Sequence, residues 1–128
     1  MVVSLHVATG GILGALVRSR PLAVALGPAL HVAGDHVPHE DIPDESFELA
    51  SGLLALGLLA ARRGPFDAAV LGGAAAAMPD VEHLLPWLRV RGEMLFHRGA
   101  GGHGVGIPVE AQLLIAGATV GWLLGRRR

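Results

Sequence analysis

Five apolar segments, joined by polar connections, set the limits on how this chain can fold. They are rich in Ala, Leu and Gly and show no period-two alternation, a pattern that favours helices over strands. Pro21, Pro65 and Pro108 stand near segment starts, where a helix tolerates a residue without an N–H group. Asp44 and Glu48 precede and open the third segment, as is typical of a helix N-terminus. We therefore predict an all-α fold with helices over Val2–Val17, Pro21–Gly34, Phe47–Ala61, Phe66–Pro79 and Ile107–Gly125.

The composition narrows the class of protein further. The chain has 128 residues, enough for one packed core and too few for two, so residues 1–128 should form a single domain. With 52% hydrophobic residues it is not a disordered chain, and a net charge of −1 argues against a nucleic-acid-binding protein. It has no cysteine, so a metal site would have to be built from His and carboxylate side chains.

The helices could lie in a soluble core or in a lipid bilayer. A membrane span needs about 20 apolar residues, and most of the segments are shorter, which favours buried core helices. Glycines spaced four apart argue the other way, because small residues at this spacing are typical of helices that pack within a bilayer. They occur at Gly10 and Gly14, and at Gly117, Gly121 and Gly125.

The charges separate by side when the five segments are threaded alternately through a membrane. One side receives ten of the eleven acidic residues. The other receives seven of the ten arginines, Arg18, Arg20, Arg62, Arg63, Arg126, Arg127 and Arg128. Because cytoplasmic loops carry the positive excess, we predict about five short transmembrane helices in the cell (inner) membrane, with the N-terminus outside and the C-terminus in the cytoplasm. The lipid bilayer is then a partner, and a homo-oligomer is compatible with this arrangement.

All seven histidines fall toward the outer side of this topology, where the second and fourth connections would form a polar cap. The first histidine motif ends the second segment. His31 and Asp35 are four residues apart and so share one helix face, and both side chain types bind divalent cations when deprotonated. His36 and His39 follow at the helix end. The alternative to a metal site is a capping Asp with surface histidines.

The second motif follows the Ala/Gly-rich part of the fourth segment. Asp80 and His83 are three residues apart and share a face, Glu82 lies between them, and Pro79 marks a turn or kink. An ionisable side chain at the end of such an apolar helix is costly unless it pairs with another group or binds a ligand. A metal site and a simple Asp–His pair at the membrane interface are the two alternatives.

Two further places carry candidate residues. His97, Arg98 and His103 lie in a glycine-rich connection, which would bring them over the other ligands and let Arg98 clamp a phosphate; a plain surface loop is the alternative. His6 stands on the apolar first segment, where a histidine is more often a hydrogen-bonded core residue. Glycines four and eight residues further on continue its face, so a neighbouring helix can approach and bring ligands to His6.

These residues resemble the motifs of a known family, the small membrane-bound metal-dependent hydrolases described as LexA-binding and inner-membrane-associated. Its members carry an early His, a Pro-Asp-x-Asp-His motif after an apolar helix, and a downstream His-Arg-Gly…His. The similar residues here are His6, Pro79–His83, His97–Gly99 and His103. That family is distantly similar to zinc-dependent phospholipase C, whose His-x-x-x-Asp pairs His31 and Asp35 resemble. Glu82 stands where the family has its second Asp, and glycines flank His103 in place of Thr and Ser.

The motifs and the resemblance together predict a zinc-type phosphoester hydrolase, acting on a lipid phosphate or phospholipid from the outer face. A divalent ion would activate water and polarise the phosphoryl oxygen, while Arg98 orients the phosphate and Glu82 acts as general base. The predicted metal ligands are His31, Asp35, Asp80, His83 and His103, with His6 and His97 as further candidates. The main alternative is a membrane protein that binds or transports a divalent metal without hydrolysis, and a structural bundle with surface histidines is the third.

Overall fold

The computed structural model describes residues 1–84 and 106–126, with the side chains of residues 83 and 84 left out. Its elements are α1 (Val3–Val17), α2 (Arg20–Asp35), α3 (Glu45–Arg63), α4 (Ala68–Ala77), the 3₁₀ helix η1 (Met78–Asp80), α5 (Val81–Leu84) and α6 (Val109–Gly125). The regular elements of these residues are all helices, and the connections contain one isolated bridge, between His39 and Ile107. The predicted all-α fold is therefore confirmed, and each predicted segment corresponds to one helix whose ends differ from the prediction by at most two residues.

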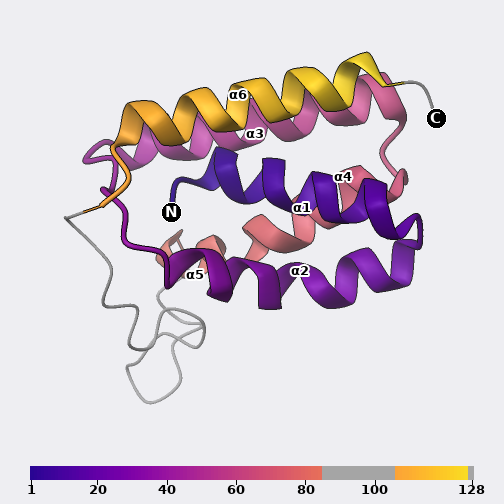
Figure 1. The fold of residues 1–128 in the computed structure, drawn as a ribbon, viewed down its shortest axis with the longest axis horizontal. Helices are drawn as coiled ribbons and strands as arrows, with labels where there is room; N and C mark the ends of the chain where they lie inside the picture. The colour runs from indigo at the N-terminus through magenta and orange to yellow at the C-terminus, as the bar shows by residue number, and fades with distance from the viewer. Residues whose placement is uncertain (85–105, 127–128) are drawn as a thin grey trace.

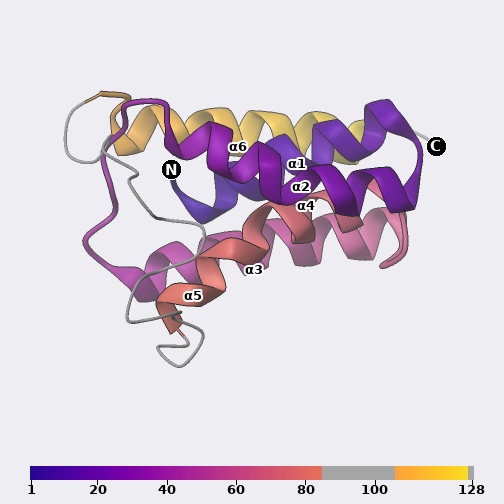
Figure 2. The same ribbon diagram turned by 90° about the horizontal axis from the view of Figure 1, so that it is seen from below.

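The long helices run up and down along one axis, with α1 in the middle (Figure 1). α1 contacts α2, α3, α4 and α6, while α4 also packs against α2 (Figure 2). Consequently, the starts of α1, α3 and α6 meet the ends of α2 and α4 at one end of the bundle. We call this the site end. The opposite end, which carries Arg18, Arg20, Arg63 and Arg126, is the arginine end.

Glycine allows α1 and α4 to touch through their main chains. A Cβ atom on Gly14 would lie 2.0 Å from the carbonyl oxygen of Ala68, and one on Gly10 would lie 2.3 Å from that of Gly72. Neither position has room for a side chain, so the predicted close approach of a helix to this face is confirmed. The glycines of α6 differ: a Cβ on Gly117 or Gly121 would meet no described atom within 4 Å.

Two aspartates begin helices at opposite ends of the bundle. Asp44 caps α3 and accepts hydrogen bonds from the N–H groups of Ser46 and Phe47 at 3.0 and 3.1 Å. The hydrogen bond from the Ser46 hydroxyl, followed by the one from the Phe47 N–H, lowers the pKa of Asp44 below its ordinary value. Asp67 caps α4 in the same way, through the N–H of Ala69 at 3.0 Å.

Large apolar side chains cover the outside of the bundle. Those on α2, α3 and α6 that are exposed are Leu22, Val24, Leu26, Phe47, Leu53, Leu54, Leu58, Leu114, Ile115 and Trp122. None of the helices in the described part of the chain has both the length and the hydropathy required to cross a bilayer.

Candidate metal centre

Four ionisable side chains from three parts of the fold meet inside the site end. His6 comes from α1, His31 and Asp35 from α2, and Asp80 from η1. Both histidines are fully buried, and their rings stack with centroids 3.9 Å apart. One ligand atom each from His6, His31 and Asp80 lies within 4.8 Å of the other two. Two imidazoles and a carboxylate at this spacing can hold a divalent metal ion.

Asp35 connects the two histidines. Its Oδ1 lies 3.0 Å from Nε2 of His6, and its Oδ2 lies 3.0 Å from Nε2 of His31. The amino group of Met1 donates to the same Oδ1 at 2.7 Å. Asp80 approaches the same nitrogen of His31, with its Oδ1 3.8 Å from Nε2. Nε2 of His31 therefore faces carboxylate oxygens from two different elements.

The end of α4 fixes the orientation of the His31 ring. Pro79 cannot donate a backbone hydrogen bond, and the helix tightens to η1 immediately before it. The last carbonyls of α4 consequently need other donors, and that of Ala76 accepts from Nδ1 of His31 at 2.8 Å. The helix break at Pro79 therefore places Asp80 beside His31. It also leaves a carbonyl that determines which nitrogen of His31 carries the hydrogen.

His39 belongs to this region, although the sequence did not single it out as a ligand. It is buried, its Nδ1 donates to the carbonyl of Val37 at 2.6 Å, and its Nε2 contacts the Met1 amino group and Asp41 Oδ1, the latter at 3.3 Å. Its place in the His31–Asp41 run was the available signal. What the sequence lacked was any sign that His39 would be buried and His36 exposed.

Gln112 was also missed. It is fully buried on α6, donates to the carbonyls of Glu40 and Ile107 at 2.8 and 3.0 Å, and accepts from the N–H of Val2 at 3.0 Å. It thereby joins the start of α1 and the connection after α2 to α6. A lone amide within an apolar helix was the signal that could have identified it.

The predicted site residues divide into three groups. His6, His31, Asp35 and Asp80 are brought together as described. Glu82 is buried on α5, and His83 lies on the same helix with its side chain outside the described residues. The last group, His97, Arg98 and His103, lies outside the described residues altogether.

A cavity of about 430 Å³ opens beside the cluster, between α1, α3 and the end of α4. Its walls include apolar side chains of α1 and α3, among them Val3, Val7, Leu49, Leu53 and Leu56. Five carboxylates also line it, Asp35, Asp41, Glu45, Glu48 and Asp80. The cavity thus combines an apolar wall with a strongly acidic side next to the histidines.

Comparison with known proteins finds no match to this chain among family models, curated proteins or solved structures. The resemblance to the membrane-bound hydrolases therefore stays a prediction that rests on the motif residues.

Proposed function

We propose that the site end holds a divalent metal ion through His6, His31 and Asp80, and that the protein uses it to hydrolyse a phosphoester. The position of His31 carries this proposal. A carbonyl oxygen only accepts hydrogen bonds, so Nδ1, which contacts the carbonyl of Ala76, carries the hydrogen. Nε2 then faces carboxylate oxygens of Asp35 and Asp80, at 3.0 and 3.8 Å. A ring nitrogen and two carboxylates that converge in this way form a donor set suited to a divalent cation.

His6 supports the same conclusion. Its Nε2 contacts Asp35, while its buried Nδ1 has no hydrogen-bond partner among the described residues. A buried ring nitrogen without a partner is costly, which suits a residue whose contacts change when a ligand binds. His6 and His31 therefore fit the donor set of a zinc-type ion, which favours imidazole and carboxylate ligands.

Each residue of the cluster has a definite task in this scheme. A divalent ion held there supplies Lewis acidity, which polarises a phosphoryl oxygen and makes water a nucleophile near neutral pH. Asp35 would orient the His6 ring through Nε2, as carboxylates behind metal-binding histidines commonly do, and beside Nε2 of His31 it stays a candidate ligand. Glu82, buried on α5 close in sequence to Asp80, remains the proposed general base, and Arg98 the proposed phosphate clamp.

The neighbouring cavity suggests the class of substrate. Its apolar wall suits the hydrocarbon part of a lipid ester, whose phosphate would reach the cluster from the acidic side. The five carboxylates would repel that phosphate in the absence of bound cations. A lipid phosphate or phospholipid is thus consistent with the cavity only when a metal ion is present.

We further propose that the bundle is embedded in the inner membrane. The large apolar side chains exposed on α2, α3 and α6 support this, because exposed apolar surface is typical of membrane interaction sites. Helices of 15–19 residues would suit a locally thinned bilayer. With the arginine end in the cytoplasm, the metal centre would open on the outer face.

A metal carrier without hydrolytic activity is the second candidate. The acidic lining of the cavity favours it, because the described residues there attract cations and include no positive side chain that would bind a phosphate. The carrier and the hydrolase share the same metal ligands and differ only in turnover.

Metal analysis of the tag-free, detergent-purified protein tests the proposal. We expect about one or more zinc-type ions per chain after loading, lost in His31→Ala and Asp80→Asn. His36→Ala is the matched control, because His36 is exposed and its Nδ1 donates to the carbonyl of Val32 on its own helix. Loaded protein should hydrolyse bis(p-nitrophenyl) phosphate or a short-chain phosphatidic acid, again unaffected by His36→Ala. Failure to take up metal refutes both candidates, whereas metal uptake without turnover of either ester leaves the carrier.

A further inference from the structure

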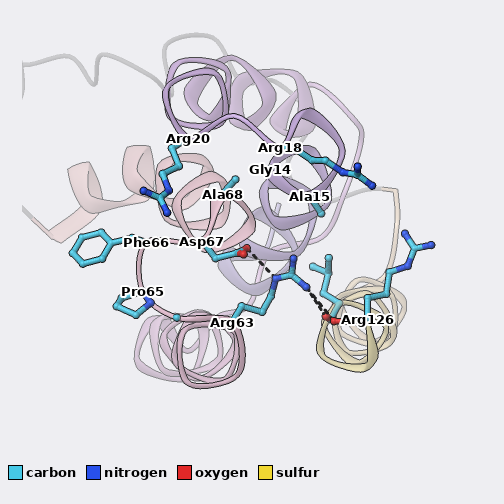
Figure 3. A pocket seen from close by; sticks show the side chains of 12 residues that line it. Gly14, Ala15, Arg18, Arg20, Arg63, Pro65, Phe66, Asp67, Ala68 and Arg126 are labelled. Atoms are coloured by element: carbon cyan, nitrogen blue, oxygen red, sulfur yellow. Dashed lines mark hydrogen bonds and ion pairs between the residues drawn. The ribbon is translucent and has the colours of Figure 1, made fainter. Parts of the chain in front are cut away.

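The arginine end contains a second, larger cavity of about 880 Å³, which the metal centre does not use. Ligand pockets typically occupy about 300–1,000 Å³, so this cavity is large enough for a small molecule or a lipid headgroup. Four arginines line it, Arg18, Arg20, Arg63 and Arg126, each from a different helix or helix end. In Figure 3, Arg20 lies on one side of the pair formed by Arg63 and Asp67, and Arg18 and Arg126 lie on the other.

Arg63 forms a fixed, buried part of the wall. Its Nε donates to Asp67 Oδ1 at 2.9 Å, and its Nη1 donates to the carbonyls of Leu123 and Arg126 at 3.2 and 3.4 Å. Only 8% of Arg63 is exposed. It therefore ties the ends of α3 and α6 to the start of α4, and its main task is structural.

The other three arginines give the cavity its excess charge. Asp67 is the one acidic side chain among the described lining residues, and it already accepts from Arg63 and from the N–H of Ala69. Arg18, Arg20 and Arg126 are exposed, so their guanidinium groups can reach a ligand. The ring of Trp122 lies 4.2 Å from the guanidinium of Arg126 and holds it by a cation–π contact.

The start of α2 adds to this positive potential. Arg20, its first residue, lines the cavity, and Ser19 makes no side-chain hydrogen bond to cap the helix. The first N–H groups of a helix favour an anion when no side chain caps them. At α4, by contrast, Asp67 already fills this role.

We propose that this cavity binds a phosphate group, carried by an anionic lipid headgroup or by a free phosphate anion. Guanidinium groups match phosphate oxygens bidentately. Three exposed arginines around one cavity, beside an uncapped helix start, supply more donors than a single phosphate needs. Since the cavity lies at the opposite end from the metal centre, the proposal does not depend on hydrolysis or on metal binding.

The test uses the full chain in maltoside micelles, with inorganic phosphate and dioctanoyl phosphatidylglycerol as separate probes in isothermal titration calorimetry. We expect saturable binding of at least one probe, weakened about tenfold or more for each arginine removed in Arg18→Gln and Arg20→Gln, and weakened further by salt. Binding of the lipid alone identifies the headgroup as the source, and binding of phosphate identifies the free anion.

Arg62→Gln is the matched control. Arg62 is an exposed arginine at the same end, but it does not line the cavity and donates instead to the carbonyl of Leu124. Its substitution should change the dissociation constant less than about twofold. The proposal is overturned if neither probe binds the wild-type chain, if Arg62→Gln weakens binding as much as Arg20→Gln, or if dioctanoyl phosphatidylcholine binds as tightly as the anionic lipid.

Discussion

The two ends of the bundle place their charged groups in opposite ways. At the site end, His6, His31 and Asp35 are buried and contact one another, whereas Arg18 and Arg20 at the arginine end are exposed. A buried ionisable cluster costs free energy unless its members satisfy each other or a bound ion. Exposed arginines have no comparable cost. Burial therefore supports a bound ligand at the site end, whereas the cavity and its excess of donors support one at the arginine end.

Arg63 is the exception at the arginine end, and removing it should have the largest effect. Arg63→Ala deprives two carbonyls and Asp67 of their donor inside the protein. We expect the free energy of unfolding to fall by about 3–5 kcal/mol, measured by thermal or chemical unfolding in detergent. Arg62→Ala, at an exposed neighbour, should cost less than about 0.5 kcal/mol. If both variants lost the same unfolding free energy, burial would not explain the stabilising role given to Arg63.

Metal loading tests the corresponding property of the site end. If the buried cluster binds an ion, zinc at a free concentration of 100 times its dissociation constant should raise the free energy of unfolding by about 2.7 kcal/mol. A chelator should reverse the gain, and His31→Ala should abolish it. The exposed His36→Ala variant should keep it. Stabilisation by zinc that persists in His31→Ala would place the ion elsewhere.

Asp67 separates two contributions at the arginine end, because its carboxylate both caps α4 and pairs with Arg63. Asp67→Ala removes both and should cost about 1–2 kcal/mol of unfolding free energy. Asp67→Asn preserves a capping oxygen and loses only the charge, so its cost should be clearly smaller. The difference in melting temperature between the two variants measures the cap. Identical melting temperatures would mean that the ion pair alone matters.

The smallest effect is expected at Asp44, at the rim of the site end. Hydrogen bonds from Ser46 and Phe47 lower its pKa in the folded protein below the ordinary 3.8. This contribution to stability is therefore fully present above pH 3.8 and is lost as the pH falls through the lowered, folded value. Asp44→Asn should slightly flatten the acid side of a plot of melting temperature against pH. If the acid side of this plot had the same slope in Asp44→Asn, the stabilising contribution assigned to the Asp44 carboxylate would be wrong.

Much of the fold could be predicted from local patterns. The first segment, predicted as Val2–Val17, is the helix Val3–Val17, and Asp44 begins the third helix as its capping chemistry indicates. The fourth helix ends at Ala77, earlier than predicted, because Pro79 lacks the N–H that would continue it. These features depend on residues close together in sequence, which is why the sequence reveals them.

The centre could be predicted only in part. The pair of His31 and Asp35 follows from a separation of one helical turn. The stacking of His6 on His31 does not, because it depends on how far α1 is displaced along α2 and α4. That displacement results from close contacts between helices at glycines. The spacing of the glycines predicts that a helix approaches, but it does not predict which residues of that helix lie opposite His6. Burial of His39 and exposure of His36 likewise depend on how the connection after α2 folds back onto α6.

The contact between α1 and α4 has a consequence for ion selectivity. His6 lies one turn before Gly10, and Asp80 lies three residues beyond the end of α4. Main chain meets main chain at Gly10 and Gly14, so neither position has a side chain that could change rotamer and alter the separation of the helices. The close contact would hold the two sides of the proposed metal centre at a fixed spacing, and proteins discriminate among divalent ions largely through such imposed geometry. Larger residues at these two positions would push the helices apart, and with them the two sides of the proposed metal centre.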